Sequence, residues 1–368
     1  MVLERQRYWR DRLESEPVRF MMREFPELLA AARGALARFV GADADDLAFV
    51  NNATSGVNTV LRSLRFKSGD ELLVTDQEYN ACRNTLNYVA ELSGAHVVVA
   101  PVPFPLKSAD EIVTAIVSRA TPRTRLALVD HVTSQTGLVF PVARIVKELA
   151  ARGIDTLVDG AHAPGMLPLD LRALGAAYYT GNCHKWLCAP KGVALLHVRR
   201  DRQELVRPLT ISHGANQPLA AGGTRFRAEL DWTGTFDPSA LLCVPEVIET
   251  LEKLVDGGWP ALMKSNHALA LEARTILCET LGVAPPAPDD MIGSLAAVPL
   301  PDDAATPAHG VEPLQNRLFD ESRIEVPIIC WPAPPMRLVR VSAQIYNHPQ
   351  QYHYLASELR RMLTTKVS

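Results

Sequence analysis

The sequence predicts an α/β fold in which a doubly wound, mostly parallel sheet is accompanied by a smaller α+β domain. Short apolar runs alternate with helical segments over the first two thirds of the chain, and this alternation fades after about residue 240. Strands separated by helices are typical of parallel sheets that are covered by helices on both faces. The length of 368 residues also predicts two domains, because an average domain has roughly 150 residues.

Four short apolar runs, rich in Leu and Val, are interpreted as strands that are buried on both faces. They cover residues 72–74, 96–99, 126–129 and 156–158. Helical segments lie between them, such as residues 109–118 and 142–152. The N-terminal residues 4–39 also predict helix, with Pro17 and Pro26 as the expected interruptions.

The C-terminal third lacks the regular alternation of strands and helices. The elements expected there are helices over residues 243–281, loops or short strands over 284–310, a strand at 338–341 and an amphipathic helix at 349–363. We therefore expect a large α/β domain over residues 21–242. A small α+β domain should combine residues 243–368 with residues 1–20.

Charge and hydropathy exclude two classes of partner. The chain has 38 Lys and Arg residues against 41 Asp and Glu residues, a net charge of −3, so it lacks the basic excess of a nucleic-acid-binding protein. No stretch approaches the roughly 18 consecutive apolar residues of a membrane span. The charged N-terminus predicts no signal peptide, and the six cysteines form no C-x-x-C pair. We expect a cytoplasmic enzyme.

Polar residues at strand ends are candidate ligand-binding residues, because open parallel sheets bind ligands beyond the carboxyl ends of their strands. Residues 51–58 form a turn of small polar residues before a helix, which suits a phosphate but also an ordinary helix N-cap. Asp159 ends the apolar run 156–158, where a carboxylate is unfavourable without a cation or hydrogen-bond donors. Residues 131–135, which include Ser134, form another donor-rich strand end. Taken alone, either of the last two strand ends is more often a structural cap than a ligand site.

The fourth candidate is Lys185, which follows His184 in a stretch of Gly and small residues. Such a lysine can form a Schiff base, although most lysines are solvated surface residues. A phosphate turn, a strand-end Asp and a His-Lys pair, in this order, favour a site for pyridoxal 5′-phosphate (PLP). PLP requires an anion site for its phosphate, a carboxylate that keeps its pyridine nitrogen protonated, and a lysine for its aldehyde.

Six motifs, distributed over nearly the whole chain, carry a resemblance to a known family. They are Asn-Ala-Thr-Ser-Gly-Val-Asn at 52–58, Glu-Tyr-Asn-Ala at 78–81, Asp-Gly-Ala-His at 159–162, Gly-Asn-Cys-His-Lys-Trp-Leu-Cys-Ala-Pro-Lys-Gly at 181–192, Trp-Thr-Gly-Thr-Phe-Asp at 232–237 and Arg-Val-Ser-Ala-Gln-Ile-Tyr-Asn at 340–347. With them the sequence resembles the class V aminotransferases of the fold-type I PLP enzymes. Within these it is similar to the isopenicillin N epimerase-like branch.

This resemblance implies a role for each residue that matches a motif. Lys185 is expected to bind the PLP aldehyde and to move the Cα proton of the substrate. Asp159 is expected to face the pyridine nitrogen, and His162 the 3′ oxygen of the cofactor, with Ser134 close by. Tyr79 takes the position of the aromatic residue that stacks on the cofactor ring.

The resemblance also implies which residues bind the phosphate of the cofactor and the carboxylate of the substrate. The residues expected at the cofactor phosphate are Ala53, Thr54, Ser55 and His184. Thr235 matches a residue that reaches the phosphate of the neighbouring subunit, which implies a homodimer with shared active sites. Arg340 resembles the arginine that binds the α-carboxylate of an amino-acid substrate, a task for which a bidentate guanidinium is better suited than an ammonium group.

Three reactions remain open for a substrate bound in such a site. The resemblance favours epimerisation at Cα of an amino acid or amino-acid-derived metabolite in specialised metabolism. C–S β-lyase chemistry on a cysteine conjugate follows closely, and class V transamination ranks third. The position of the acid and the presence of a leaving group decide among the three reactions, whereas the fold does not.

Alternatives from other classes stay open as well. A metal-dependent hydrolase would need side chains that converge on an ion, here Asp159, His131, His162 and His184. A PLP-binding protein without catalysis is the other alternative. Cys330 invites comparison with cysteine desulfurases, but its apolar surroundings at residues 326–331 favour a buried thiol.

Overall fold

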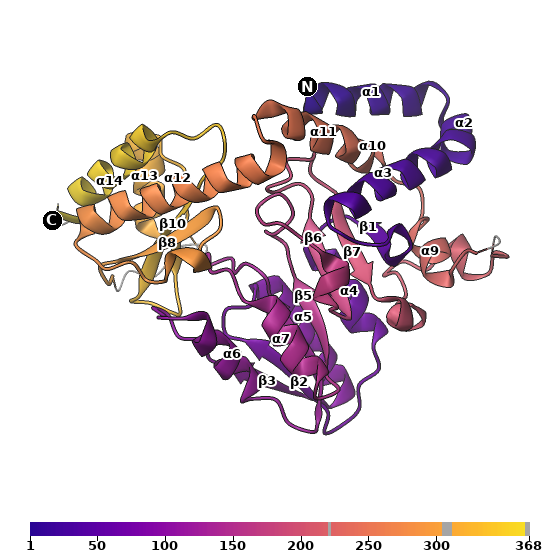
Figure 1. The fold of residues 1–368 in the computed structure, drawn as a ribbon, viewed down its shortest axis with the longest axis horizontal. Helices are drawn as coiled ribbons and strands as arrows, with labels where there is room; N and C mark the ends of the chain where they lie inside the picture. The colour runs from indigo at the N-terminus through magenta and orange to yellow at the C-terminus, as the bar shows by residue number, and fades with distance from the viewer. Residues whose placement is uncertain (220–221, 304–310, 365–368) are drawn as a thin grey trace. The chain divides into compact units, whose positions relative to one another are not determined.

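The structure, a computed structural model, describes residues 1–219, 222–303 and 311–364. Within these ranges the strands form a seven-stranded sheet in the order β1-β7-β6-β5-β4-β2-β3 and a separate three-stranded sheet. The strands of the larger sheet are β1 (Leu47–Val50), β2 (Glu71–Thr75), β3 (His96–Ala100), β4 (Thr124–Asp130), β5 (Asp155–Asp159), β6 (Tyr178–Asn182) and β7 (Ala194–Val198) (Figure 1). The predicted α/β fold is therefore confirmed, and all four predicted strands lie in this sheet.

Most of this sheet is parallel. The pairs of β3, β2, β4, β5 and β6 are parallel, whereas β7 runs antiparallel to both of its neighbours, β6 and β1. The loop of residues 183–193 contains no crossover helix, so β7 returns beside β6 in the opposite direction. As a result, the carboxyl ends of β1, β2, β4, β5 and β6 meet at one edge of the sheet.

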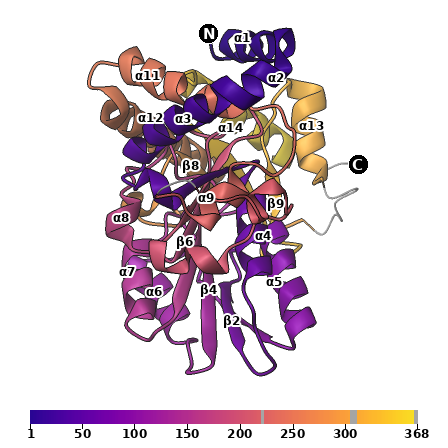
Figure 2. The same ribbon diagram turned by 90° about the vertical axis from the view of Figure 1, so that its right-hand side faces the viewer.

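Helices cover both faces of the sheet (Figure 2). On one face lie α4 (Ala53–Ser63) and α5 (Asn80–Ser93), and on the other lies α7 (Val142–Ala150). A close approach joins α4 to the sheet, because a Cβ atom added to Gly56 would lie 2.2 Å from Thr180 Oγ1 on β6. Only glycine permits this packing distance, which brings the start of α4 to the carboxyl end of β6.

The predicted N-terminal helix is divided at its prolines. The structure has α1 (Val2–Ser15), α2 (Pro17–Arg19), a π-helical turn at Phe20–Glu24 and α3 (Phe25–Phe39). Pro17 and Pro26 each lie in the first turn of a helix, where a missing N–H removes no intrahelical hydrogen bond. The other helices before residue 260 are α6 (Ala109–Val117), α8 (Leu171–Leu174), α9 (Arg225–Leu230), α10 (Ser239–Leu242) and α11 (Val244–Leu254).

The chain divides into two compact units. The first comprises Met1–Pro101, Val113–His131 and Pro141–Trp259, and the second Val102–Ile112, Val132–Phe140 and Pro260–Ser368. The second unit contains an antiparallel sheet of β8 (Leu295–Leu300), β10 (Arg337–Ser342) and β9 (Ile328–Cys330), in that order, with the helices α12 (Gly258–Leu281), α13 (Pro313–Ser322) and α14 (Pro349–Thr364). Of the region expected as loops or short strands, Leu295–Leu300 is thus a strand, and residues 304–310 lie outside the described residues.

This division differs from the expected domains, 21–242 and 243–368 with 1–20, in the place of the N-terminal helix. Residues 1–20 lie in the first unit, because polar side chains of α1 bond to the segment around α10. Gln6 Nε2 donates to Ser239 Oγ at 3.2 Å, and Arg10 Nε donates to Asp237 Oδ2 at 2.8 Å. The segments 102–112 and 132–140 join the second unit although they precede residue 243.

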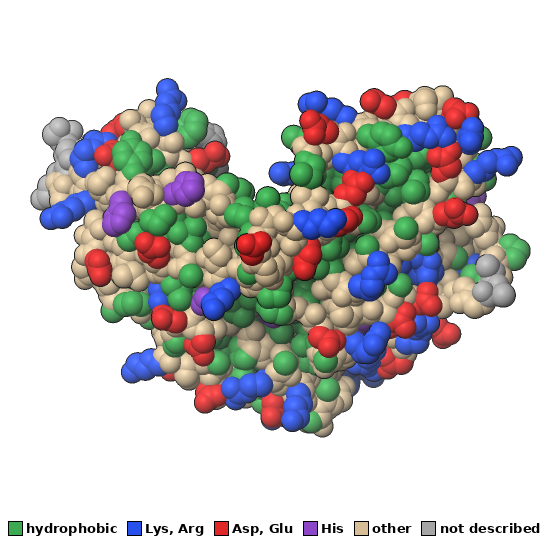
Figure 3. Space-filling model, turned by 45° about the horizontal axis from the view of Figure 1, so that its top comes forward, with side chains coloured by type: hydrophobic (Ala, Val, Ile, Leu, Met, Phe, Trp, Pro, Cys, Tyr) green, Lys and Arg blue, Asp and Glu red, His purple; other side chains and the backbone are tan. Residues whose placement is uncertain are grey.

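The surface carries both signs of charge. Lys and Arg side chains are interspersed with Asp and Glu on the face shown in Figure 3, in keeping with the net charge of −3. Among the described helices, none combines the length and the apolar character needed to traverse a bilayer.

Candidate active site

The buried acidic residues of the first unit gather at the carboxyl edge of the large sheet. Asp159 is the last residue of β5, as the sequence predicted, and lies opposite Asp130, the last residue of β4. The backbone of the two strands stays paired beyond this point, because His131 N donates to Asp159 O at 2.8 Å. Two carboxyl groups therefore end adjacent strands side by side.

Asp159 accepts hydrogen bonds through both carboxylate oxygens. Oδ1 accepts from the backbone N–H of Ala161 at 2.9 Å, and Oδ2 accepts from Cys82 Sγ at 3.2 Å. The residue is only 2% exposed, and this burial raises its pKa, while the two hydrogen bonds and the charge of Lys185 act to lower it. A buried carboxylate in this position is stabilised by any positively charged group that comes into contact with it.

Glu78 and Asp130 are two further buried carboxyl groups beside Asp159. Burial, and next the charges of Asp130 and Asp159, raise the pKa of Glu78 well above its ordinary value. Within the described part of the chain, both carboxylate oxygens of Glu78 and Oδ2 of Asp130 are buried without a well-formed hydrogen bond. Three such groups cannot all be ionised at this separation. Because Asp159 accepts two hydrogen bonds that act to lower its pKa, we expect it to be the ionised group and Glu78 to hold a proton.

These additional acidic residues were missed by the sequence analysis, although one signal was present. Asp130 ends the apolar run 126–129, so the rule that singled out Asp159 applies equally to it. Glu78 lies in the matched motif 78–81, but no role was expected of it. Cys82 gave no signal, because its contact with Asp159 joins residues that are 77 positions apart.

Lys185 is held by a hydrogen-bonded chain of side chains. Its Nζ atom lies 3.0 Å from His162 Nε2, and Trp186 Nε1 donates to His162 Nδ1 at 3.2 Å. His162 and Trp186 are buried, whereas the side chain of Lys185 is exposed. In its protonated form Lys185 lowers the pKa of Asp159, so the lysine and the strand-end carboxylate that the sequence singled out lie in one site.

A tight turn after β6 presents Lys185 in this way. Cys183 N donates to Val193 O at 3.1 Å, which closes the loop, and Cys188 N donates to Lys185 O at 3.1 Å. Within the same loop, His184 Nδ1 contacts Val193 O at 2.9 Å, and burial lowers the pKa of His184. The Nδ1 atom of His184 is therefore engaged by the backbone, and only Nε2 is left for a ligand.

The expected phosphate turn is the N-terminus of α4. Two of its first backbone N–H groups are used within the protein, since Ala53 N donates to Asn182 Oδ1 at 2.9 Å and Ser55 N to Asn52 Oδ1 at 2.8 Å. The bond to Asn182 ties this turn to the end of β6, close to the His-Lys pair in sequence. An anion here would be bound by the N–H of Thr54, by the hydroxyl groups of Thr54 and Ser55, and by the helix dipole.

Two of the expected residues lie on exposed parts of the first unit. Tyr79 precedes α5, and its side chain is 45% exposed, so its ring is available to stack on a ligand. Thr235 is exposed in the loop between α9 and α10, next to Gly234 with φ of 124°.

The second unit contains the other two expected residues, Ser134 and Arg340. An Nη atom of Arg340 donates to the backbone oxygen of Ser134 and lies 3.3 Å from Ser134 Oγ. Arg340 Nε is buried without a hydrogen bond among the described residues. The guanidinium is thus oriented by Ser134 and retains a donor that a ligand carboxylate would satisfy. Cys330 is partly buried in β9, and burial raises its pKa, which disfavours a nucleophilic thiolate.

The histidines of the metal-site alternative do not converge on one point. His131 Nδ1 contacts Tyr179 Oη at 2.9 Å, His162 contacts Lys185 and Trp186, and His184 contacts a backbone oxygen. In the described ranges, the acidic and thiol groups whose ligand atoms lie within 4.8 Å of one another are those of Glu78, Cys82 and Asp159. Burial raises the pKa of the Cys82 thiol, so that it stays protonated. This arrangement does not support the metal-dependent hydrolase.

The residues present do fit PLP. Asp159 is a buried carboxylate that a protonated pyridine nitrogen would stabilise, and Lys185 is an accessible amine in the same site. The start of α4 supplies donors for a phosphate, and Tyr79 supplies an exposed ring. Each of these groups matches one chemical requirement of the cofactor.

Comparisons with known proteins agree with this chemistry. The sequence matches the aminotransferase class-V family over residues 13–289. It is 36% identical over 362 residues to isopenicillin N epimerase of Streptomyces clavuligerus, covering 95% of this chain and 88% of that protein. It is 33% identical over 378 residues to a probable chloroplastic L-cysteine desulfhydrase of Arabidopsis thaliana, covering 96% of this chain and 78% of that protein.

A similar fold occurs in solved structures. The cystine C-S lyase C-DES, in complex with its reaction product cysteine persulfide, matches with a TM-score of 0.78 and 21% sequence identity, covering 98% of this chain and 93% of that one. The match to the family extends over most of the chain, and the two relatives named above match 95% and 96% of it. The chain therefore belongs to the aminotransferase class-V family and is a PLP-dependent enzyme.

Proposed function

We propose that this enzyme removes the Cα proton of an amino acid or amino-acid-derived metabolite and that Cα then takes a solvent-derived proton on the opposite face, as in an epimerase of specialised metabolism. The observation that carries the proposal is the position of Lys185, an exposed amine held at 3.0 Å from His162 and acting electrostatically on Asp159. The identity of 36% to an isopenicillin N epimerase over most of the chain supports epimerisation in particular.

Each residue of the site has a task in this proposal. PLP, when bound, supplies the electron sink that makes the Cα proton acidic. Asp159 holds the ring nitrogen in its charged form, because its carboxylate is buried and ionised. Lys185 takes the proton at Cα and carries it at Nζ. The resemblance assigns the α-carboxylate of the substrate to Arg340, whose guanidinium suits a carboxylate.

A C–S β-lyase is the second candidate. Relatives named L-cysteine desulfhydrase support it, and a cystine C-S lyase has the same fold. Such a reaction needs a substrate with sulfur on Cβ, and it needs no nucleophilic cysteine of the enzyme. The raised pKa of Cys330 is compatible with this and argues against a persulfide carried on that thiol. Class V transamination remains the third candidate.

We also propose that the enzyme is a homodimer with shared active sites. Its proposed location is the cytoplasm. Thr235, the residue expected to reach the phosphate of the neighbouring subunit, lies on an exposed loop of the first unit. No disulfide joins any of the six cysteines, all of which lie in the described residues, and this is typical of proteins kept in a reducing compartment. Sedimentation at several protein concentrations would test the dimer.

A proton-exchange assay in D2O tests the reaction. Purified enzyme with PLP is incubated with a panel of L- and D-amino acids, tripeptides and cysteine conjugates, and the products are identified by NMR and chiral chromatography. Epimerisation gives deuterium at Cα with inversion, a β-lyase gives pyruvate and a thiol, and transamination gives a keto acid. Exclusive formation of a keto acid that retains the side chain of the substrate would reject both leading candidates.

Substitution of the lysine provides the matched control. Lys185→Ala should abolish both exchange and the PLP absorbance band that depends on a covalent link to the enzyme. Lys253→Ala, which removes an exposed lysine of α11 that pairs with Glu249, should leave both unchanged. A Lys185→Ala protein that retains the absorbance band would refute the assignment of this lysine.

A further inference from the structure

We propose that Trp186 is a positioning residue that fixes the tautomer of His162 and so orients a single N–H group toward Lys185. The proposal deepens the proposed function, on which its catalytic meaning rests. It concerns a side chain for which the sequence analysis assigned no role. The three residues form one line of contacts, from the Trp186 indole through the His162 ring to the Lys185 amine.

The indole of Trp186 has one N–H donor and no acceptor. Trp186 Nε1 lies 3.2 Å from His162 Nδ1, so Nδ1 must accept this bond through its lone pair. A neutral imidazole carries its one hydrogen on the other nitrogen, here Nε2. An imidazolium would instead turn an N–H toward the indole N–H, and the two donors would repel each other. The contact therefore selects the neutral Nε2–H form of His162.

The next contact depends on this choice. His162 Nε2 lies 3.0 Å from Lys185 Nζ. If Nε2 is the donor, Nζ must accept the bond through a lone pair, and only a neutral amine has one. The neutral amine is also the form that attacks an aldehyde and that takes a proton from carbon. Trp186 thus favours the reactive form of Lys185 without touching its amine.

With PLP bound, the same N–H has a second possible acceptor. The resemblance expects His162 beside the 3′ oxygen of the cofactor, and an oxyanion there requires a donor. The Nδ1–H tautomer would present a lone pair at Nε2 and repel that oxygen. The contact with the indole therefore keeps the Nε2–H group of His162 available as a donor both without PLP and with PLP bound.

The indole cannot easily turn away from this position. Trp186 is 7% exposed and His162 is 8% exposed, so neither ring has water to replace its partner. Gly165 lies directly against the backbone of Trp186, because a Cβ atom added there would lie 2.5 Å from Trp186 C and 2.5 Å from Leu187 N. Its φ of 85° is also one that favours glycine. This close approach holds the loop that carries both Trp186 and Lys185.

Trp186→Phe provides the test, because phenylalanine keeps an aromatic ring and removes the N–H. Trp259→Phe is the matched control. Trp259 is equally buried, at 5% exposure, and its Nε1 donates to Ile248 O at 3.0 Å. Both variants lose one buried indole hydrogen bond, but only Trp186 contacts the histidine. Thermal unfolding of both variants measures the structural cost that they share.

The readout is the ¹⁵N NMR spectrum of histidine ring nitrogens in the full-length protein, with and without PLP. The His162 signals are identified by their absence in His162→Gln. In the parent protein and in Trp259→Phe we expect Nε2 protonated and Nδ1 unprotonated. Loss of one hydrogen bond changes the ratio of the two tautomers by roughly tenfold, so Trp186→Phe should show a substantial Nδ1–H population.

Two results would overturn the proposal: a parent protein in which His162 Nδ1 is protonated, or a Trp186→Phe spectrum identical to that of the parent. If Trp186→Phe does not fold, 3-benzothienylalanine at position 186, which keeps the bicyclic shape but has no N–H, gives the same comparison. The spectrum taken without PLP does not depend on the reaction. A changed tautomer together with failed D2O exchange would therefore reject the proposed function and retain the role of Trp186.

Discussion

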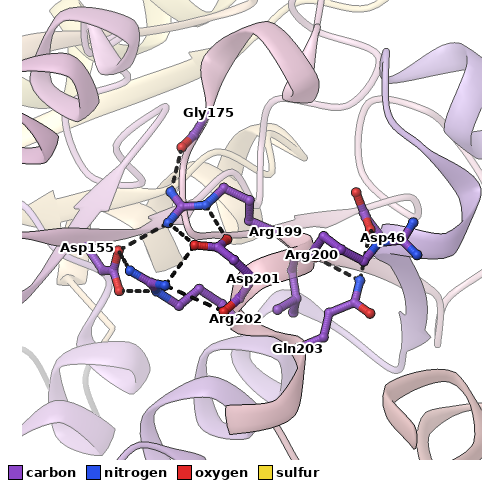
Figure 4. A network of polar contacts seen from close by, with 9 residues as sticks. Asp46, Asp155, Gly175, Arg199, Arg200, Asp201, Arg202 and Gln203 are labelled. Atoms are coloured by element: carbon purple, nitrogen blue, oxygen red, sulfur yellow. Dashed lines mark hydrogen bonds and ion pairs between the residues drawn. The ribbon is translucent and has the colours of Figure 1, made fainter. Parts of the chain in front are cut away.

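The two ends of β5 carry the same residue type in opposite environments. Asp155 begins the strand with a side chain that is 27% exposed, and it bonds to Arg202 at 2.6 Å and lies 3.6 Å from Arg199 (Figure 4). Asp159 ends the strand at 2% exposure and bonds to a thiol and a backbone N–H. The charge of Asp155 is neutralised by arginines of its own chain, whereas Asp159 could pair with a positively charged group of a bound ligand.

Other acidic residues at the amino and carboxyl edges of the sheet differ in the same way as Asp155 and Asp159. At the amino edge, hydrogen bonds from Thr121 and Arg123 lower the pKa of Glu71. At the carboxyl edge, burial raises the pKa of Glu78 and of Asp130. Ion pairs that are already complete stabilise the fold, whereas buried carboxyl groups without a cation are typical of functional sites. The comparison shows which end of the sheet serves the chemistry.

Removing the carboxylate charge at one end of β5 or at the other should give the largest difference in the rate of Cα exchange. Asp159→Asn should lower the rate of Cα exchange by at least about 100-fold, because a neutral amide no longer stabilises the charged ring nitrogen. Its PLP content should stay close to that of the parent. Asp155→Asn should leave the exchange rate unchanged. Equal exchange rates in the two variants would remove the functional distinction between the two ends.

Removing the thiol donor should have a smaller effect on the same reaction. Cys82→Ala takes a hydrogen bond from Asp159 Oδ2, and we expect the Cα exchange rate to fall about threefold to tenfold, the effect of one ordinary hydrogen bond, because a thiol is a weak donor. Cys82→Ser, which supplies a hydroxyl donor, should recover most of the loss. Cys243→Ala removes an equally buried thiol and is the control. A slow Cys243→Ala variant would show that packing alone explains the result.

The proton on Glu78 should appear in the pH dependence of stability. A carboxyl group with a raised pKa holds more protons in the folded chain, so its contribution is present below the ordinary Glu value of about 4.3 and is lost as pH rises through the folded pKa. Glu78→Gln cannot ionise. Its free energy of unfolding in urea should therefore decrease less than that of the parent from pH 5 upward. Parallel pH profiles would mean that Glu78 is ionised in the folded protein.

The smallest effect is expected at the amino edge. Arg202→Ala breaks the bonds to Asp155, but both side chains are about a third exposed, at 31% and 27%, and such ion pairs contribute about 1 kcal/mol or less. The free energy of unfolding should fall by that amount, with no change in Cα exchange, and the difference should shrink at 1 M salt. A large decrease in the rate of Cα exchange in Arg202→Ala would show that the two ends of β5 are energetically coupled.

Sequence reasoning found those features of the site that are local in the chain. Asp159 and Lys185 each stand at the end of an apolar run or in a short motif, so periodicity and residue type are sufficient to single them out. The contacts of Cys82 with Asp159, and of Trp186 with His162, join residues 77 and 24 positions apart. No local pattern records such pairs, because they depend on which strand ends are neighbours.

The order of apolar runs and polar strand ends determined the α/β class, the cofactor chemistry and the family of this protein. These follow from side-chain burial and from the requirements of PLP, both of which are written into short stretches of sequence. Only the tertiary structure decided the reversed direction of β7, the place of the N-terminal helix in the first unit, and the burial that raises the pKa values of Glu78, Asp130 and Asp159. The physical reason is that burial and charge interactions depend on distances in space, which the folded sheet sets and the linear sequence does not.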